Sequence, residues 1–363
     1  GGAQRVFTHL ANAWAAEGRP ISLVTLSAPG SDFFRLAPEI RRISIDGLAP
    51  SKGPLAAVTA NLRRLKALRR AFKACGAPRV LAFTGAMNVL TVLATRGLGL
   101  EVTISERNDP ARQSLGRAWD LLRRRTYPMA DRVTANSRGA IATLERFVPA
   151  EKLAFVPNPV VQDRSSARAD LAGPTILNVG RLAPQKAQDV LIDAFAAVAA
   201  DHLGWQLAIV GTGESEAALR RQAGDLGIAD RVHFVGQVAD PNPYYLAAEV
   251  FALPSRFEGT PNVLLEAMSA GMPCIVSDAS GGPLEYVDDG KTGLVVPADD
   301  WQALVGALRR LIENPDLRQA LGEAARQRLR GHGAEAVLEA WTEALGLDPL
   351  PAGRLSAEAD ARG

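Results

Sequence analysis

PSRFEGTPNVLLEAMSAGMPCIVSD, residues 254–278, is the stretch that decides how this sequence is interpreted. It follows an apolar run typical of a buried strand, and it places Glu258 and Glu266 on either side of a Gly-Thr-Pro turn. Proline suits the first helical position, which needs no backbone donor, so a helix is expected to open at about Pro261. A strand, a tight turn and a helix start predict the ligand-binding edge of a parallel sheet.

The start of this helix is a candidate phosphate site. The backbone N–H groups of Asn262, Val263 and Leu264 are expected to be free there and to point out of the helix. Glu258 precedes the helix and Glu266 lies about one and a half turns into it. The two carboxylates are therefore expected to contact different parts of one extended ligand, such as a sugar and a ribose. A carboxylate can accept hydrogen bonds from two hydroxyls of such a ring.

Two cations follow the strand expected at 175–179, in the run GRLAPQK of residues 180–186. Arg181 comes just after the strand and Lys186 five residues later. Doubly wound sheets bind their ligands at the carboxyl ends of the strands. Arginine offers a planar fork to phosphate oxygens and lysine a mobile point charge, so the pair predicts a phosphorylated ligand.

A glycine turn, GTGE at residues 211–214, follows the next expected strand. Glu216 stands where the third glycine of a dinucleotide fingerprint would be, and no acidic ribose ligand follows at the usual distance. We interpret these glycines as a tight turn near the ligand and do not expect NAD.

Short apolar runs alternate with longer amphipathic segments, which is typical of parallel α/β architecture. The expected strands lie at 21–26, 80–83, 102–105, 133–135, 154–156, 175–179, 206–210, 232–235, 250–253 and 274–277. The expected helices lie at 5–17, 57–74, 188–200, 214–226, 262–270 and 300–313. The predicted fold class is α/β, with two Rossmann-like, doubly wound domains facing across a cleft.

A length of 363 residues favours two domains. The proline-rich segment 156–160 is expected to link a first domain, 1–158, to a second, 159–346, whose last helix is a candidate to pack back on the first. Residues 347–363 are expected to form a flexible tail. A helix that opens directly after a Gly-Gly turn ordinarily follows a strand, so the first domain is expected to lack its first strand.

The compartment is predicted from what the sequence contains and lacks. Cys75 and Cys274 lie far apart and suggest no disulfide framework, which favours a reducing compartment. We find no secretory signal and no apolar run near the roughly 18 residues that span a bilayer. The protein is expected to be cytoplasmic, either soluble or peripheral on the inner face of the plasma membrane.

Charge divides the chain into a basic and an acidic half. Residues 1–160 carry 24 Lys and Arg against 11 Asp and Glu, a net charge of +13, whereas the remainder carries −11. The segment 57–73 predicts an amphipathic helix with one apolar face and six cations, and 123–125 is a second basic run. Such a helix can lie on an anionic membrane surface, and a core helix with a solvated face is the alternative. No nucleic-acid recognition motif accompanies these cations.

The segments GGAQRV (1–6), NVGRLAPQKAQDVLIDAF (178–195), AIVGTGESEAALR (208–220), HFVGQV (233–238) and 254–278 together resemble the family 4 glycosyltransferases. Those are retaining enzymes of the two-Rossmann GT-B fold. The resemblance implies transfer of a hexose or N-acetylhexosamine from a nucleoside diphosphate sugar, by family frequency a UDP-sugar. The implied acceptor is lipid-linked or a polysaccharide, in cell-envelope glycan synthesis such as that of lipopolysaccharide.

The resemblance also implies roles for single residues. Arg181 and Lys186 correspond to the pair that neutralises the donor diphosphate, Glu258 to the residue facing the donor sugar, and Glu266 to the one holding the ribose. The backbone groups implied to hold the phosphates are those of Thr260, Asn262 and Val263, and the backbone of Val238 is implied to contact the base. Gly2 corresponds to the glycine loop that closes over the diphosphate, with Gln4 in place of the usual glutamate.

The first domain departs from the family pattern in one respect. Many members place a histidine after a first-domain strand, whereas residues 105–109 here read SERND. Glu106 and Asn108 are the acceptor-side candidates in its place. No cofactor and no metal are expected, and the resemblance implies front-face attack with the donor phosphate assisting.

Two other functions remain open on the sequence. A UDP-sugar 2-epimerase has similar architecture, but it needs proton-transfer groups, and no histidine here lies in a motif. A non-enzymatic two-domain sugar-binding protein would need neither Arg181 and Lys186 nor both glutamates around a diphosphate.

Overall fold

The computed structural model describes residues 2–26, 35–45, 54–111, 114–160, 167–279, 281–330 and 332–348. The chain forms two compact units, of which the first comprises Gly1–Pro159 with Glu335–Gly363 and the second comprises Val160–Ala334. The division falls one residue after the expected boundary. The last helix, assigned on the sequence to the second domain, belongs to the first unit. The expected tail lies outside the described residues from position 349 onward.

The first unit is built on parallel strands, with two of them in one sheet, β1-β2, and four in another, β3-β4-β5-β6. Its strands are β1 (Ser22–Thr25), β2 (Arg41–Ser44), β3 (Arg79–Phe83), β4 (Glu101–Glu106), β5 (Arg132–Ala135) and β6 (Leu153–Phe155). Its helices are α1 (Gly2–Ala16), α2 (Pro54–Cys75), α3 (Gly85–Thr95), α4 (Arg117–Thr126), η1 (Tyr127–Met129), α5 (Arg138–Leu144), η2 (Ala150–Lys152) and α13 (Ala334–Ala344).

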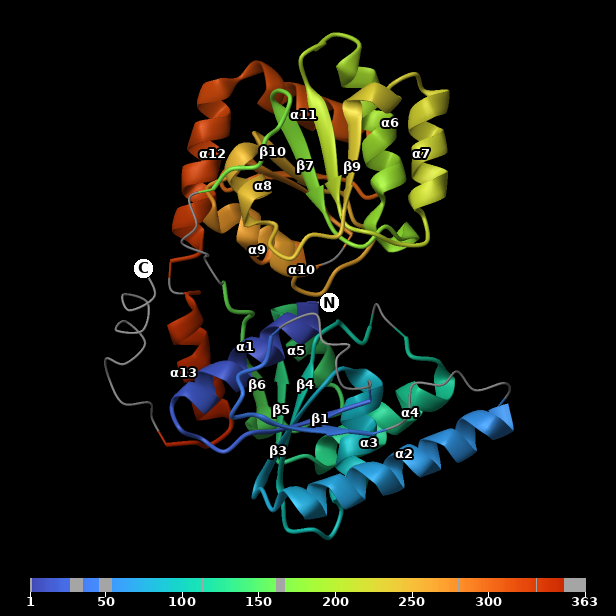
Figure 1. Cartoon of the computed structure of the whole chain (residues 1–363), viewed down its shortest axis with the longest axis vertical. Helices are drawn as coiled ribbons and strands as arrows, with labels where there is room; N and C mark the ends of the chain where they lie inside the picture. The colour runs from blue at the N-terminus through green and yellow to red at the C-terminus, as the bar shows by residue number, and fades with distance from the viewer. Residues whose placement is uncertain are drawn as a thin grey trace. The chain divides into compact units, whose positions relative to one another are not determined.

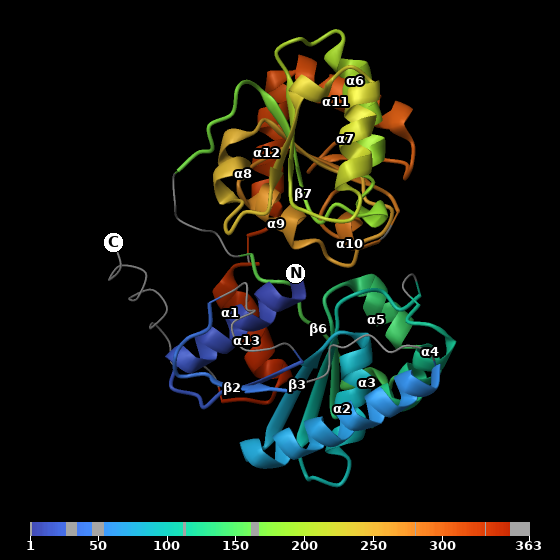
Figure 2. The same ribbon diagram turned by 45° about the vertical axis from the view of Figure 1, so that its right-hand side comes forward.

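The C-terminal helix α13 packs against α1, the first helix of the chain, as both views of the ribbon show (Figures 1 and 2). Its indole Trp341 is fully buried in a cluster with Leu10 and Trp14 of α1 and with Phe83 of β3. Burying large aromatic and aliphatic side chains is the main favourable term in such an association. The apolar face of α13 therefore fixes the chain end to the first unit.

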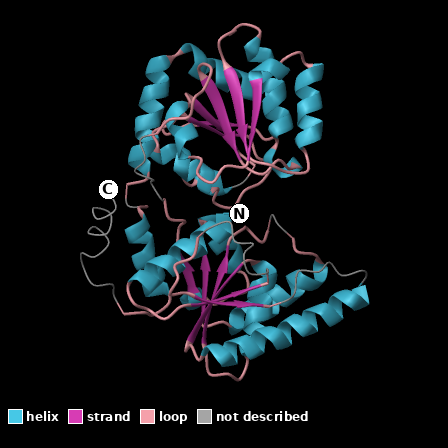
Figure 3. Cartoon of the chain, in the orientation of Figure 1, coloured by secondary structure: helices cyan, strands magenta, loops and turns pink. Residues whose placement is uncertain are grey.

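The second unit is one six-stranded parallel sheet of order β12-β11-β10-β7-β8-β9, covered by helices (Figure 3). Its strands are β7 (Thr175–Val179), β8 (Gln206–Val210), β9 (Val232–Gly236), β10 (Val250–Leu253), β11 (Cys274–Ser277) and β12 (Leu294–Val296). Its helices are η3 (Pro184–Lys186), α6 (Gln188–Ala199), α7 (Glu216–Asp225), η4 (Ala229–Arg231), α8 (Asn242–Ala247), α9 (Asn262–Ser269), α10 (Gly281–Leu284), α11 (Trp301–Glu313) and α12 (Pro315–Arg328).

Every strand and helix expected from the sequence is present, and the strands missed are short or charged. β2 begins with two arginines, which hide the alternation of a half-buried strand, and β12 has only three residues. The helices α3, α4, α5, α8, α10 and α12 were also missed. The mostly apolar sequence of α3 has no polar face to reveal a helical period, and α5, α8 and α10 have fewer than eight residues each. No helix among the described residues is both long and apolar enough to cross a membrane.

Candidate functional site

The predicted site residues of the second unit lie at the point where the strand order of its sheet reverses. The chain passes from β7 through α6 to β8 on one side, and β10 lies on the other side of β7. Because the strands are parallel, the loops after β7, β8 and β10 leave from the same edge. Doubly wound sheets bind ligands at such a switch point. The structure thus brings Arg181, Lys186 and Glu258 to one edge.

Lys186 and Glu258, 72 positions apart in the chain, are in direct contact. The Lys186 Nζ donates to Glu258 Oε1 at 2.5 Å, and the Ser255 hydroxyl donates to the same oxygen at 2.8 Å. The Glu258 side chain is 8% exposed and that of Lys186 17%. A nearly buried carboxylate is stabilised by such a cation and such a hydroxyl, since unpaired it would carry a large desolvation cost.

The side chain of Arg181 is exposed, unlike that of Lys186, whereas hydrogen bonds hold the backbone around Arg181 in place. Gly180 N–H donates to the Val210 carbonyl at 2.9 Å, and the buried Gln188 amide donates to the Arg181 carbonyl at 3.2 Å. No residue in the described ranges bonds to the Arg181 guanidinium. Nor do three His, Cys, Asp or Glu side chains of those ranges gather to hold a metal ion.

Close backbone contacts explain the glycines around these cations. A Cβ on Gly211, whose φ is +140°, would lie 1.9 Å from the Gly180 carbonyl oxygen. A Cβ on Gly282 of α10 would lie 1.5 Å from the Gly259 carbonyl oxygen, in the turn between the two glutamates. The first contact agrees with the tight turn predicted at 211–214. The second was missed, although Gly281-Gly282 soon after a strand is a turn signal.

The start of α9 differs in one respect from the expectation. Pro261 caps the helix, and its carbonyl accepts the Leu264 N–H at 3.1 Å, so that donor is not free. The Val263 N–H has no partner among the described residues. Pro261 is extended, so α9 starts at Asn262 rather than at the proline. The prediction of a free Leu264 donor is therefore wrong, because a tight first turn consumes it.

The remaining second-unit candidates lie around α9. Glu266 accepts a hydrogen bond from the Tyr245 hydroxyl of α8 at 3.0 Å. The sequence did not single out Tyr245, which is 3% exposed and orients this carboxylate. Thr260 is buried in the turn before α9, and Val238 follows β9 by two residues.

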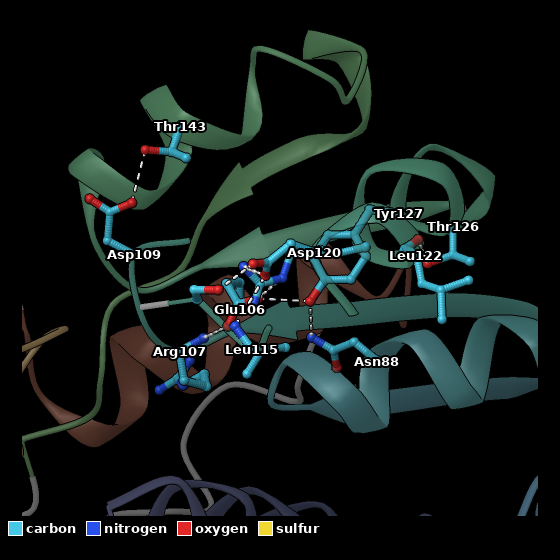
Figure 4. Close-up of polar contacts among 12 residues, drawn as sticks. Asn88, Glu106, Arg107, Asp109, Leu115, Asp120, Leu122, Thr126, Tyr127 and Thr143 are labelled. Carbon is cyan, nitrogen blue, oxygen red and sulfur yellow. Dashed lines mark hydrogen bonds and ion pairs between the residues drawn. The ribbon is translucent and has the colours of Figure 1, made fainter. Parts of the chain in front are cut away.

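Glu106, an acceptor-side candidate, turns inward at the end of β4 (Figure 4). Its carboxylate accepts the Tyr127 hydroxyl at 2.7 Å and lies 3.6 Å from Arg123 Nε. The Asn88 amide donates to the same Tyr127 oxygen at 3.1 Å. Burial raises the pKa of Glu106, and the Arg123 charge opposes that rise. These contacts make Glu106 a member of a buried network.

The other two first-unit candidates stand differently. Asn108 is exposed, two residues beyond the end of β4, and it stays the acceptor-side prediction. Gly2 is the first residue of α1, at a helix start rather than in an extended loop. Gly1 lies outside the described residues.

Some curated relatives match nearly the whole of this chain, and others match about half of it. An alpha-1,4-N-acetyl-D-galactosaminyltransferase of Campylobacter jejuni, named for its PP-undecaprenol-linked glycan, is 28% identical over 351 residues, 94% of each chain. A GDP-mannose-dependent alpha-(1-6)-phosphatidylinositol monomannoside mannosyltransferase of Mycobacterium tuberculosis is 37% identical over 201 residues, 50% of this chain and 52% of that one.

Solved structures share the fold. Sucrose-phosphate synthase of Thermosynechococcus elongatus superposes with a TM-score of 0.80 at 21% identity, over 100% of this chain and 94% of that one. The family description "Glycosyl transferase 4-like domain" matches residues 1–159, and "Glycosyl transferases group 1" matches 162–328. The chain is therefore an enzyme of the GT-B fold and belongs to the group 1 family of glycosyltransferases.

Proposed function

We propose that this enzyme moves a hexose or N-acetylhexosamine, with retention, from a nucleoside diphosphate sugar to a lipid-linked or polysaccharide acceptor in cell-envelope glycan synthesis. The observation that carries the proposal is the joining of Arg181, Lys186 and Glu258 at the sheet's switch point. A diphosphate leaving group gains negative charge as it departs, and fixed cations stabilise that charge. The PP-undecaprenol-linked glycan in the name of the Campylobacter relative supports a lipid-linked acceptor.

Retention is proposed to follow from front-face attack. Glu258 already accepts hydrogen bonds from Lys186 and Ser255, which lowers its reactivity as a nucleophile. The acceptor hydroxyl would then attack the anomeric carbon on the face that the diphosphate leaves. The bond to the phosphate oxygen breaks, the bond to the acceptor oxygen forms, and the acceptor proton passes to the departing diphosphate.

The donor nucleotide decides the first experiment. UDP is favoured by family frequency, whereas the mannosyltransferase relative is named for GDP-mannose. We expect calorimetric titration of the full chain with UDP, GDP and ADP, without added metal, to show binding of one of them. The sugar conjugates of that nucleotide then identify the donor. Failure of a folded protein to bind any of the three would refute the proposed function.

Metal removal tests how the leaving-group charge is stabilised. Two cations and the start of α9 supply positive potential at the donor edge, so we propose that no divalent ion takes part. We expect the transfer rate to stay within about twofold when EDTA is added in excess. A rate that falls with EDTA and returns with Mg²⁺ or Mn²⁺ would overturn this.

A membrane-borne acceptor is also supported by the surface of α2. This helix of 22 residues contains no acidic residue. Four of its cations lie exposed along one side, and no described residue pairs with them: Arg63, Lys66, Arg70 and Lys73. Leu62, 53% exposed, adjoins them. We propose that α2 lies on the anionic inner face of the plasma membrane, where each cation contributes about 1 kcal/mol.

Replacing three of these cations tests the surface. We expect Arg63→Gln/Lys66→Gln/Arg70→Gln to weaken binding to vesicles rich in phosphatidylglycerol by about 100-fold, since roughly 3 kcal/mol is lost. Vesicle co-sedimentation at low salt measures this. Arg221→Gln/Lys291→Gln/Arg310→Gln, which removes three exposed cations of the second unit, is the matched control. Equal effects of both triple variants would contradict a specific surface.

A further inference from the structure

Arg256, two residues before Glu258, bonds to three separate segments of the second unit. Its Nη1 and Nη2 donate to the two Asp189 carboxylate oxygens at 3.1 and 2.7 Å. Its Nε donates to Asp299 Oδ1 at 2.6 Å, and its Nη1 also donates to the Pro184 carbonyl. The guanidinium is thus used within the protein, in contrast to that of Arg181.

These partners connect the loop of Glu258 to the loop of Lys186. Pro184 begins η3, the short helix that ends at Lys186, and Asp189 lies in the first turn of α6, which follows it. The Arg256 N–H also donates to the Gln185 carbonyl at 2.8 Å. In return the Gln185 side-chain amide donates to the Phe257 carbonyl at 2.9 Å. The two loops are therefore held together by side-chain and backbone bonds.

Electrostatics favours this arrangement. Asp189 approaches Arg256 as a bidentate carboxylate, which is the strongest geometry for an arginine pair. The hydrogen bonds to Asp189 raise the pKa of Arg256, and the negative charges of Asp189 and Asp299 add to this rise. Asp299 has a φ of +59°, a left-handed conformation that costs energy for a residue with a side chain. The bond to Arg256 offsets part of that cost.

We propose that Arg256 is a positioning residue of the donor site, which keeps Lys186 and Glu258 in contact before the donor binds. The inference rests on the proposed function for the role of those two residues. Four of the five N–H donors of Arg256 are used within the protein, so the side chain is largely committed to these contacts. Its side chain is 30% exposed, so its pairs contribute little to global stability. Small displacements of catalytic groups, however, change rates strongly.

Hydrogen exchange of the protein without ligand tests the clamp directly. In Arg256→Gln, we expect peptides covering 183–187 and 254–259 to exchange about tenfold faster, because their opening costs less free energy. Arg309→Gln is the matched control, since it breaks another exposed arginine–aspartate pair of the same unit, at 2.8 Å from Asp201. Unchanged exchange of both loops in Arg256→Gln would refute the clamp, whether or not a nucleotide binds.

Kinetics test the consequence for the donor site. We expect Arg256→Gln to lower kcat by about 100-fold with a Tm near that of the wild type, and Arg256→Lys to recover part of the loss. Asp189→Asn should act similarly, and the double variant should be no worse than either single one. Wild-type kcat in Arg256→Gln, or fully additive losses, would overturn the positioning role. A wild type that binds no nucleotide would instead refute the proposed function.

Discussion

Arg181→Ala is expected to lower the transfer rate by about 10²- to 10³-fold, the usual cost of removing one preorganised group that stabilises developing charge. The Arg181 carbonyl is held by Gln188 of α6 and the preceding Gly180 N–H by Val210 of β8, whereas the exposed guanidinium has no partner among the described residues. The side chain is therefore available for the donor diphosphate, and its removal should leave the fold unchanged. Initial rates and calorimetric titration of the nucleoside diphosphate measure the two effects.

The control for this prediction is Arg221→Ala, which removes another exposed arginine of the second unit, on α7. It should keep both the wild-type rate and the wild-type nucleotide affinity. If Arg181→Ala binds and reacts like this control, Arg181 has no part in the donor site. If instead its Tm falls by several degrees, the residue acts through the fold.

Local patterns predicted all the described strands except β2 and β12, and they predicted fewer of the helices. They did not identify which residues of distant segments come into contact. Strands β7, β8, β10 and β11 begin and end where their apolar runs do. The helix α13 shows the limit, because the sequence favoured packing of the last helix on the first domain but did not identify the residues that it covers. Only the tertiary structure shows that Trp341 packs with Leu10 and Trp14, more than 320 positions away.

The site shows the same division. The placement of Lys186 and Glu258 at one edge of the sheet could be predicted because each comes after a strand, and parallel strands end at one edge. Their direct contact could not, since it depends on how two loops fold over each other. Arg256 was missed for this reason, because its carboxylate partners come from α6 and from the loop before α11. Glu106 likewise lies at the end of a strand, yet its side chain turns toward Tyr127.

The contact between Lys186 and Glu258 is expected to affect nucleotide affinity and transfer rate in opposite directions. Lys186 is expected to bind the diphosphate, but without a donor it is held by the carboxylate at 2.5 Å. With Arg181, the three side chains carry a formal net charge of +1. Replacing Glu258 by glutamine raises this to +2 at nearly constant volume. The change strengthens attraction for an anion and removes the carboxylate that is proposed to face the donor sugar.

Glu258→Gln is therefore expected to bind the nucleoside diphosphate as tightly as the wild type or up to about tenfold more tightly, a Coulomb effect of roughly 1–2 kcal/mol. Its transfer rate should nonetheless fall by about 10²-fold or more, since an interaction with the reacting sugar is lost.

Lys186→Ala should lose both nucleotide affinity and transfer rate, because it removes the phosphate contact and leaves Glu258 without its cation. Calorimetry and initial rates separate the two variants. Equal loss of nucleotide affinity in both would mean that the ion pair serves the fold of the loops, and that Glu258 does not face the donor sugar.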